Sequence, residues 1–151
     1  MAAGVSIRSY RHGDEDQVVA LWQACELTQP WNDPRRDIAR KLDAQAGPFW
    51  VAEADEVLVG TVMVGYDGHR GWINYLAVDQ TWRGQGIARA LMAHAERELT
   101  SLGCPKLNLQ VRSGNRQVLA FYERLGYLQD DVVCLGKRLI HDNNNTPPET
   151  A

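Results

Sequence analysis

The sequence lacks the features that mark several special classes of protein. No apolar run approaches the roughly 20 residues of a membrane-spanning helix, and the opening MAAGVSIRSYRHGDED has neither the basic nor the apolar region of a secretory signal. The three cysteines, Cys25, Cys104 and Cys134, form no C-x-x-C pair and no zinc pattern with the histidines. We therefore expect a cytoplasmic protein that binds no metal and no membrane.

An excess of basic charge is also missing. The chain has 16 Lys and Arg residues against 19 Asp and Glu residues, for a net charge of −3. Proteins that grip a phosphate backbone carry a basic patch or stripe. The composition therefore predicts no nucleic-acid partner.

Length and composition are those of one globular domain. The 151 residues are 44% hydrophobic and 23% charged, close to the average for soluble folded proteins. The last ten residues, DNNNTPPETA, are polar and contain two prolines, which is typical of disordered ends. We predict a single domain over residues 1–141 and a disordered tail over residues 142–151.

Hydrophobic periodicity predicts a chain that mixes strands and helices. Apolar runs and period-two alternation, separated by turn residues such as Asp-Gly, indicate strands at residues 5–11, 48–54, 57–66, 72–78, 106–111 and 131–139. Helical spacing, with caps at Asp33 and Asn115 and stops at Gly103 and Gly126, indicates helices at residues 15–27, 34–42, 87–102 and 115–125. The order predicts an α/β (mixed α+β) fold with helices on both faces of one sheet.

The segment VDQTWRGQGIARAL, residues 78–91, contains the most informative motif. A helix that begins at a glycine-rich turn offers free N–H groups and a positive dipole end to an anion. A P-loop needs Lys followed by Ser or Thr, but Arg89 and Ala90 stand in its place, and a dinucleotide fingerprint needs a third glycine where Arg89 stands. The remaining interpretation is a pyrophosphate-binding motif of the form R-x-x-G-x-[GA], at Arg83, Gly86 and Ala88.

With this motif the chain resembles the GNAT superfamily, the GCN5-related N-acetyltransferases. The segments WINYLAV, RGQGIA, KLNLQV and NRQVLAFYERLGY follow one another as the family's hallmarks do, and PWNDP and GYDGHRG are similar to the small bacterial YpeA-like branch. The resemblance implies a mostly antiparallel central sheet of six to seven strands with about four helices. It also implies that strand 72–78 carries a β-bulge near residues 74–76 and splays away from strand 106–111.

The resemblance implies acetyl-CoA as the cofactor and a primary amine as the acceptor, on a small molecule, a peptide N-terminus or a lysine. The pantetheine arm would pair with the backbone of strand 72–78, whose N–H near Leu76 or Ala77 would stabilise the oxyanion. Tyr122 would be the catalytic proton donor, although an aromatic residue on a helix is by default a packing residue. The implied cofactor-binding residues are Leu76, Ala77, Val78, Arg83, Gly84, Gln85, Gly86, Ile87, Ala88, Arg89, Asn115 and Tyr122.

The general base is not defined by the sequence. Gln110 stands where some relatives carry a catalytic glutamate, and an amide cannot accept the proton. Glu53, Asp67, His69 and an ordered water all stay open as replacements. The loop with Trp31, Asn32 and Asp33 is expected to form one wall of the acceptor site, although Asp33 already has a sufficient role as a cap.

Two further questions stay open at this level. Gln110 also motivates an alternative function, a non-catalytic module that binds acyl-CoA as a sensor. A homodimer is open as well, because the apolar DVVCL in residues 131–135 suits either a buried strand or a subunit interface.

Overall fold

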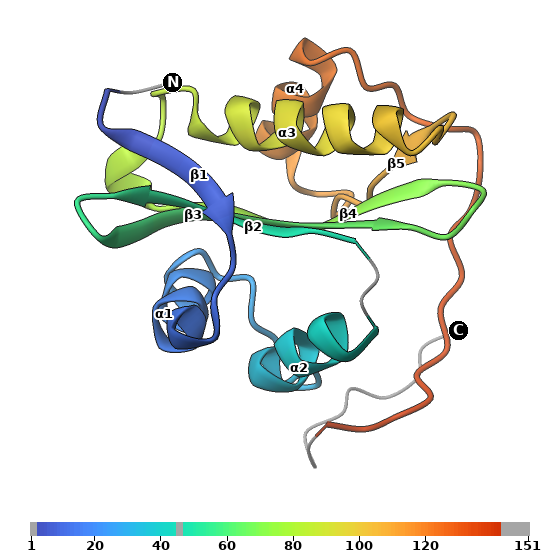
Figure 1. Ribbon diagram of the computed structural model, residues 1–151. Helices are drawn as coiled ribbons and strands as arrows, with labels where there is room; N and C mark the ends of the chain where they lie inside the picture. The colour runs from blue at the N-terminus through green and yellow to red at the C-terminus, as the bar shows by residue number, and fades with distance from the viewer. Residues whose placement is uncertain (1–2, 45–46, 143–151) are drawn as a thin grey trace.

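The computed structural model describes residues 3–44 and 47–142 and shows three layers (Figure 1). A sheet lies between one pair of helices, α1 and α2, and a second pair, α3 and α4. The strands are β1 (Val5–Ser9), β2 (Phe49–Ala54), β3 (Val57–Tyr66), β4 (Gly71–Val78) and β5 (Leu107–Asn108). The helices are α1 (Glu15–Ala24), α2 (Pro34–Ala44), α3 (Ile87–Ser101) and α4 (Arg116–Arg124), with short 3₁₀ turns η1 (His12–Asp14) and η2 (Gln80–Trp82).

The sheet has the order β1-β2-β3-β4-β5 and is antiparallel up to β4. The β4–β5 pair is parallel and short, since only Gly71 and Trp72 pair with Leu107 and Asn108. Beyond Trp72 the two strands part, so that the second half of β4 has no ladder on this side among the described residues. The expected splay between these two strands is therefore present.

Local turn chemistry sets the ends of several elements as the sequence predicts. The β2–β3 turn holds Asp55 and Glu56 at φ 50° and 64°, the left-handed region. The Asp33 carboxylate accepts hydrogen bonds from the backbone N–H groups of Arg35 and Arg36 and so caps α2, which begins at Pro34. Asn115 caps α4 by accepting from the N–H of Val118 at 3.2 Å.

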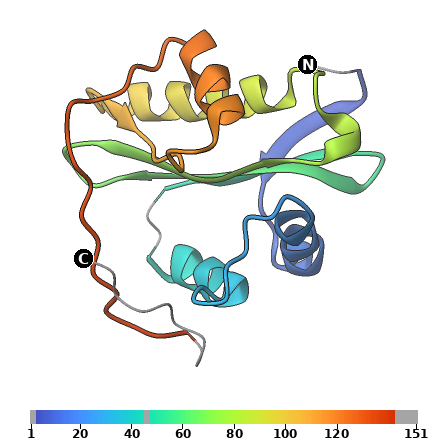
Figure 2. The same cartoon turned by 180° about the vertical axis from the view of Figure 1, so that it is seen from behind.

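Each face of the sheet has its own apolar core. On the α1/α2 face, Trp22 and Ile38 pack against Val51 and Met63. On the α3/α4 face, Ile87, Leu91, Met92, Ala95, Leu99 and Tyr122 pack against the sheet. Because β3 and β4 lie between both cores, their central residues are held from two sides (Figure 2).

The expected bulge is present in β4. Thr61 pairs with Ala77 and Met63 pairs with Asn74, so Val62 lies opposite two residues, Tyr75 and Leu76. Tyr75 has a φ of 51°, which is uncommon for a residue with a Cβ. The bulge therefore needs support from its surroundings.

Thr61 supplies that support through a buried relay. The Trp22 indole N–H donates to Thr61 Oγ1 at 2.9 Å, and the Thr61 hydroxyl donates to the carbonyl of Tyr75, also at 2.9 Å. The rings of Trp22 and Tyr75 stack with centroids 3.7 Å apart. The Trp22 indole N–H, the Thr61 hydroxyl and the Tyr75 carbonyl thus all have hydrogen-bond partners inside the α1/α2 core.

The expectation of six to seven strands is wrong for the described residues, which form five. The strand expected at residues 131–139 makes no backbone ladder there, and the one expected at 106–111 pairs only at Leu107 and Asn108. The reason is the path of the chain after α4. It passes the β5 side of the sheet and ends against α2 on the opposite face, so it never lies along β5 in ladder register (Figures 1 and 2).

Asp142 holds the end of this path, although the sequence assigns it to the tail. Its side chain is buried, and it accepts from the backbone N–H of Asp33 at 2.8 Å and from the Arg40 guanidinium. The hydrogen bond from Arg40, which has the larger effect, and the one from the Asp33 N–H lower the pKa of Asp142 to about 2. The rest of the expected tail, residues 143–151, lies outside the described residues. No helix in the described part of the chain has the length and apolarity to cross a membrane.

The relay predicts that removing the Thr61 hydroxyl lowers the free energy of unfolding. Thr61→Val keeps the shape of the side chain but leaves the Trp22 N–H without an acceptor and the Tyr75 carbonyl without a donor. We expect the free energy of unfolding to fall by about 1–3 kcal/mol in urea titrations. Thr100→Val is the matched control, because the exposed Thr100 hydroxyl donates only to Glu96 of its own helix; a change as large as that of Thr61→Val would remove the special role of the relay.

Candidate functional site

The glycine-rich turn before α3 has a backbone that requires its glycines. Gly84 has a φ of 77° and Gly86, the residue that precedes α3, a φ of 81°. A Cβ built on Gly84 would meet no atom within 4 Å. The protein itself therefore leaves open space at this turn, into which a ligand can approach the backbone.

The N–H groups of this turn are free to bind an anion. From Gly84 to Arg89 the backbone N–H groups have no acceptor among the described residues, and the first that does is Ala90, bonded to the carbonyl of Gly86 at 3.0 Å. These N–H groups lie at the positive end of α3, a helix of 15 residues. Such a row of donors at a helix start is suited to an anion.

Two arginines flank the turn. Both Arg83 and Arg89 are exposed. The Nε of Arg83 donates to the carbonyl of Val78 at 3.2 Å, which ties the turn to the end of β4 while the side chain keeps further donors. Positive charge is therefore present beside the free N–H groups.

Tyr122 lies in the α3/α4 core together with Leu76, which is half-buried against the same cluster. Its ring meets Phe121 and Tyr127 edge to face at 5.1 and 5.6 Å. Burial raises the pKa of Tyr122 to about 12, and its hydroxyl has no hydrogen-bond partner within residues 3–44 and 47–142. The side chain is thus both a packing residue and an uncommitted donor.

Three candidates for the general base lie away from the bulge or are already engaged. Glu53 is in β2, two strands from β4, and its ion pair with Arg8 lowers its pKa. Asp67 and His69 are in the turn before β4, and Asp67 accepts from two backbone N–H groups and the Trp72 indole, which lower its pKa to about 2. Gln110 is exposed and its amide contacts Cys134. None of these side chains is on the bulge of β4, and those of Glu53 and Asp67 already have partners.

The structure adds a carboxylate that the sequence reading missed. Asp37, in the first turn of α2, accepts from the hydroxyl of Tyr75 at 2.6 Å and from Arg40 at 3.2 Å. Burial is the larger cause and the hydrogen bond to Asp37 the second; together they raise the pKa of Tyr75 well above its usual range. Because Asp37 and Tyr75 are 38 positions apart, no local pattern links them. Asp37 thus reaches the bulge residue from the α1/α2 face.

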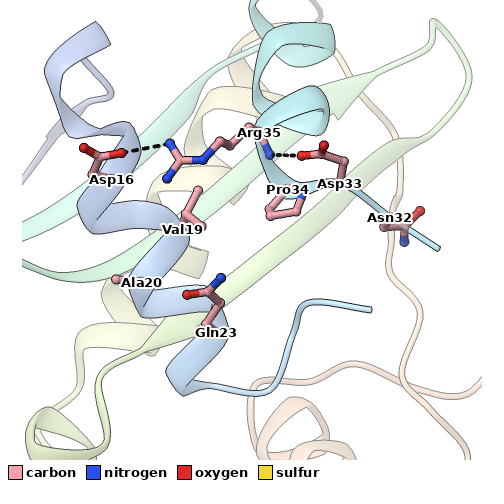
Figure 3. Close-up of a pocket in the computed structure, with 8 residues that line it drawn as sticks. All are labelled: Asp16, Val19, Ala20, Gln23, Asn32, Asp33, Pro34 and Arg35. Atoms are coloured by element: carbon pink, nitrogen blue, oxygen red, sulfur yellow. Dashed lines mark hydrogen bonds and ion pairs between the residues drawn. The ribbon is translucent and has the colours of Figure 1, made fainter. Parts of the chain in front are cut away.

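The expected acceptor loop borders a hollow of about 560 Å³ between α1 and α2 (Figure 3). Asn32 and Asp33 line it, and Trp31 is not part of the lining. Arg35 reaches across from α2 to Asp16 on α1 at 2.8 Å. The hollow is polar and open, and its wall carries both carboxylates and amides.

Comparison with known proteins agrees with this geometry. Residues 16–127 match the Acetyltransferase (GNAT) family. The chain therefore belongs to the GNAT acetyltransferase family. The chain is 50% identical over 139 residues to "Acetyltransferase SG1711" of Sodalis glossinidius (strain morsitans), covering 91% of this chain and 98% of that protein. The resemblance seen in RGQGIA and its neighbouring motifs is confirmed, and so is the expectation of an acyltransferase.

Solved structures share the GNAT fold at low sequence identity. A predicted acetyltransferase from Clostridium acetobutylicum with acetyl-CoA has a TM-score of 0.72 at 19% identity, covering 92% of this chain and 99% of that chain. The aminoglycoside acetyltransferase AAC(6')-Iy, in complex with the bisubstrate analogue CoA-S-monomethyl-acetylneamine, has a TM-score of 0.74 at 20% identity, covering 89% and 98%. At such identity these structures support the fold of the GNAT family.

The positive φ of the turn predicts the effect of adding a methyl group there. Gly86→Ala forces an L-residue into the left-handed region, so we expect the free energy of unfolding to fall by about 1–2 kcal/mol. Gly114→Ala is the control, since Gly114 has open space and no positive φ. Urea titration of both variants measures the difference, and equal stability of the two would contradict the assigned backbone conformation.

The raised pKa of Tyr122 predicts a loss of stability in alkali. The unfolded chain loses this proton near pH 10, whereas the folded chain keeps it to about 12. The folded state therefore binds more protons in this window, and the stabilisation, complete below about pH 10, falls by roughly 1 kcal/mol per pH unit above it. Urea titrations from pH 9 to 11 should show a steeper decline for the native protein than for Tyr122→Phe; parallel declines would mean that the ring is not desolvated as described.

Proposed function

We propose that this protein is an acetyl-CoA-dependent N-acetyltransferase that transfers the acetyl group directly to a primary amine while both substrates are bound. The observation that carries the proposal is the row of free N–H groups from Gly84 to Arg89 at the start of α3. This turn follows the end of β4, whose second half has no ladder toward β5 among the described residues. An anion site next to an open strand edge suits a ligand with a pyrophosphate and an amide-rich arm.

The chemistry of the residues at this turn supports acetyl-CoA as the ligand. The N–H groups of Gly84, Gln85, Gly86, Ile87, Ala88 and Arg89 would hold the pyrophosphate, with added charge from Arg83 and Arg89. The backbone of β4 at Leu76, Ala77 and Val78 would pair with the pantetheine amides, and Asn115 would contact the ligand from the start of α4 while it caps the helix. Acetyl-CoA would supply an activated acyl group at the splay.

The chain's own groups support the transfer in three ways. A backbone N–H near Leu76 or Ala77, fixed by the bulge, would donate to the developing oxyanion, and a fixed donor needs no reorganisation when the charge forms. Tyr122 would donate a hydrogen bond to the departing thiolate. Its high pKa keeps it protonated at neutral pH, and also makes complete proton transfer to a thiolate less favourable than hydrogen bonding.

The acceptor amine must be neutral when it attacks, so its proton has to leave. We propose that ordered water carries this proton, because Glu53 and Asp67 are engaged by other groups and His69 is in the turn before β4, away from the bulge. The carboxylate of Asp37, which accepts from the hydroxyl of the bulge residue Tyr75, is the group on the α1/α2 face that would receive it from the water. AAC(6')-Iy, whose complex contains an acetylated neamine analogue, makes aminoglycosides a reasonable first acceptor class.

The alternative function is a module that binds acyl-CoA and does not catalyse. Gln110 is the observation in its favour, since its amide contacts Cys134 and cannot act as a base. The same free N–H groups would serve this function. The two functions differ only in turnover.

One pair of measurements separates them. Calorimetry with CoA tests binding, and thiol release from acetyl-CoA with aminoglycosides, peptide N-termini and lysine tests turnover. We expect Tyr122→Phe to lower kcat at least tenfold with CoA affinity changed less than twofold, because the lost group acts on the leaving thiolate. Tyr66→Phe is the control, as Tyr66 is in β3 and its hydroxyl makes only a 3.4 Å contact with Gly68.

The outcomes are distinct. CoA binding without turnover in the native protein supports the non-catalytic module. Absence of CoA binding contradicts both functions. Equal kcat for the native protein and Tyr122→Phe removes Tyr122 from the mechanism and leaves the transferase proposal with the free N–H groups before α3 as its main support.

A further inference from the structure

Tyr127 contacts both the backbone and the ring of Tyr122, the side chain that would act on the departing thiolate. The α4 helix ends in a Schellman motif, with Gly126 at a φ of 93°. In this motif the Tyr127 N–H donates to the carbonyl of Tyr122 at 3.0 Å, and the Gly126 N–H donates to the carbonyl of Glu123, also at 3.0 Å. The apolar contact that often accompanies such a motif is here the pair of tyrosine rings, which meet edge to face at 5.6 Å.

The hydroxyl of Tyr127 joins this end of α4 to α3. It donates to Glu96 Oε1 at 2.6 Å. No other hydrogen bond between described residues connects residues 116–127 with α3. Apolar packing holds both helices on the same face of the sheet (Figures 1 and 2), but apolar packing is non-directional, whereas a hydrogen bond has a preferred length and angle. The bond to Glu96 therefore defines how the end of α4 lies against α3.

Tyr122 has no comparable attachment of its own. Its hydroxyl has no hydrogen-bond partner in the described parts of the chain. Its other ring neighbour, Phe121 at 5.1 Å, is the preceding residue of α4 and moves with that helix. Burial first, and then the hydrogen bond to Glu96, raise the pKa of Tyr127 well above its usual range, so its hydroxyl remains a donor at neutral pH. Tyr127 is therefore the ring neighbour that connects Tyr122 to a second helix.

Building on the function proposed above, we propose that Tyr127 is a positioning residue for Tyr122, and that its hydrogen bond to Glu96 sets the distance between the Tyr122 hydroxyl and the free N–H groups before α3. The same helix, α3, follows those N–H groups and carries Glu96. A ligand bound at its start and the hydroxyl on α4 thus share one reference element. Small displacements of a reacting group are costly in catalysis, so a looser α4 lowers the rate. Tyr127 acts on the reaction only through Tyr122.

Removal of the Tyr127 hydroxyl tests this role with little change in packing. Tyr127→Phe keeps the ring and the helix cap, and Glu96→Ala removes the acceptor from an exposed position. Each should lower kcat about three- to tenfold, with CoA affinity by calorimetry changed less than twofold. Glu96→Gln should keep kcat within about twofold of the native value, because its amide oxygen still accepts the hydrogen bond. Glu98→Ala is the matched control, since the Glu98 carboxylate, on the same helix, has no partner among the described residues.

A double-variant cycle separates positioning from a general structural effect. If Tyr127 acts through Tyr122, Tyr127→Phe should cause no further loss of kcat in a protein that already carries Tyr122→Phe. A structural effect would instead lower kcat by the same factor in both backgrounds. That equal factor overturns the proposal, and so does a native kcat in Tyr127→Phe.

NMR reads the Tyr122 ring without turnover, and so distinguishes failure of this proposal from failure of the transferase function. In protein with tyrosine isotopically labelled at Cζ, the Tyr122 signal is the one lost in Tyr122→Phe. It should shift or broaden in Glu96→Ala and stay in place in Glu96→Gln and Glu98→Ala. An unchanged signal in Glu96→Ala overturns the positioning role. A shifted signal in a protein without turnover supports that role and contradicts only the transferase function.

Discussion

The hydroxyl of Thr61 fixes the part of the structure on which the site depends. It accepts from Trp22 and donates to the carbonyl of Tyr75, and in this way it holds a residue at positive φ in the middle of a sheet. Without the bulge, β4 would continue as a regular strand and its backbone would face elsewhere. Strain of this kind persists only where the surrounding core determines it, as the stacked ring of Trp22 does here.

The free N–H groups before α3 and the bulge are joined by β4. The strand ends at Val78, whose carbonyl accepts from Arg83, and the glycine turn follows within a few residues. Phosphate binding at Gly84 to Arg89 would therefore set the position of a ligand along β4. A shift in the bulge would move the reacting end of that ligand while leaving its anionic end in place.

The sequence predicted those features that depend only on residues close together in the chain. The Asp33 and Asn115 caps, the hairpin turns and the glycine turn depend on neighbours within three or four residues, so the sequence was sufficient for them. The contact of Asp37 with Tyr75 joins residues far apart in the chain and left no pattern to read. The roles of the cofactor residues stay predictions, because geometry shows which donors are free but not which ligand they meet.

Residues 131–139 show why strand number was the least predictable property. Apolar alternation says that a segment is suited to pairing, but the partner can be the same sheet or another chain, and the sequence pattern is equal in both cases. What decides is whether the segment can reach its own sheet in register. Here Asp130 is bonded to Lys106 and to Asn108 of β5, Asp142 is bonded at the start of α2, and the described residues between them form no ladder with β5.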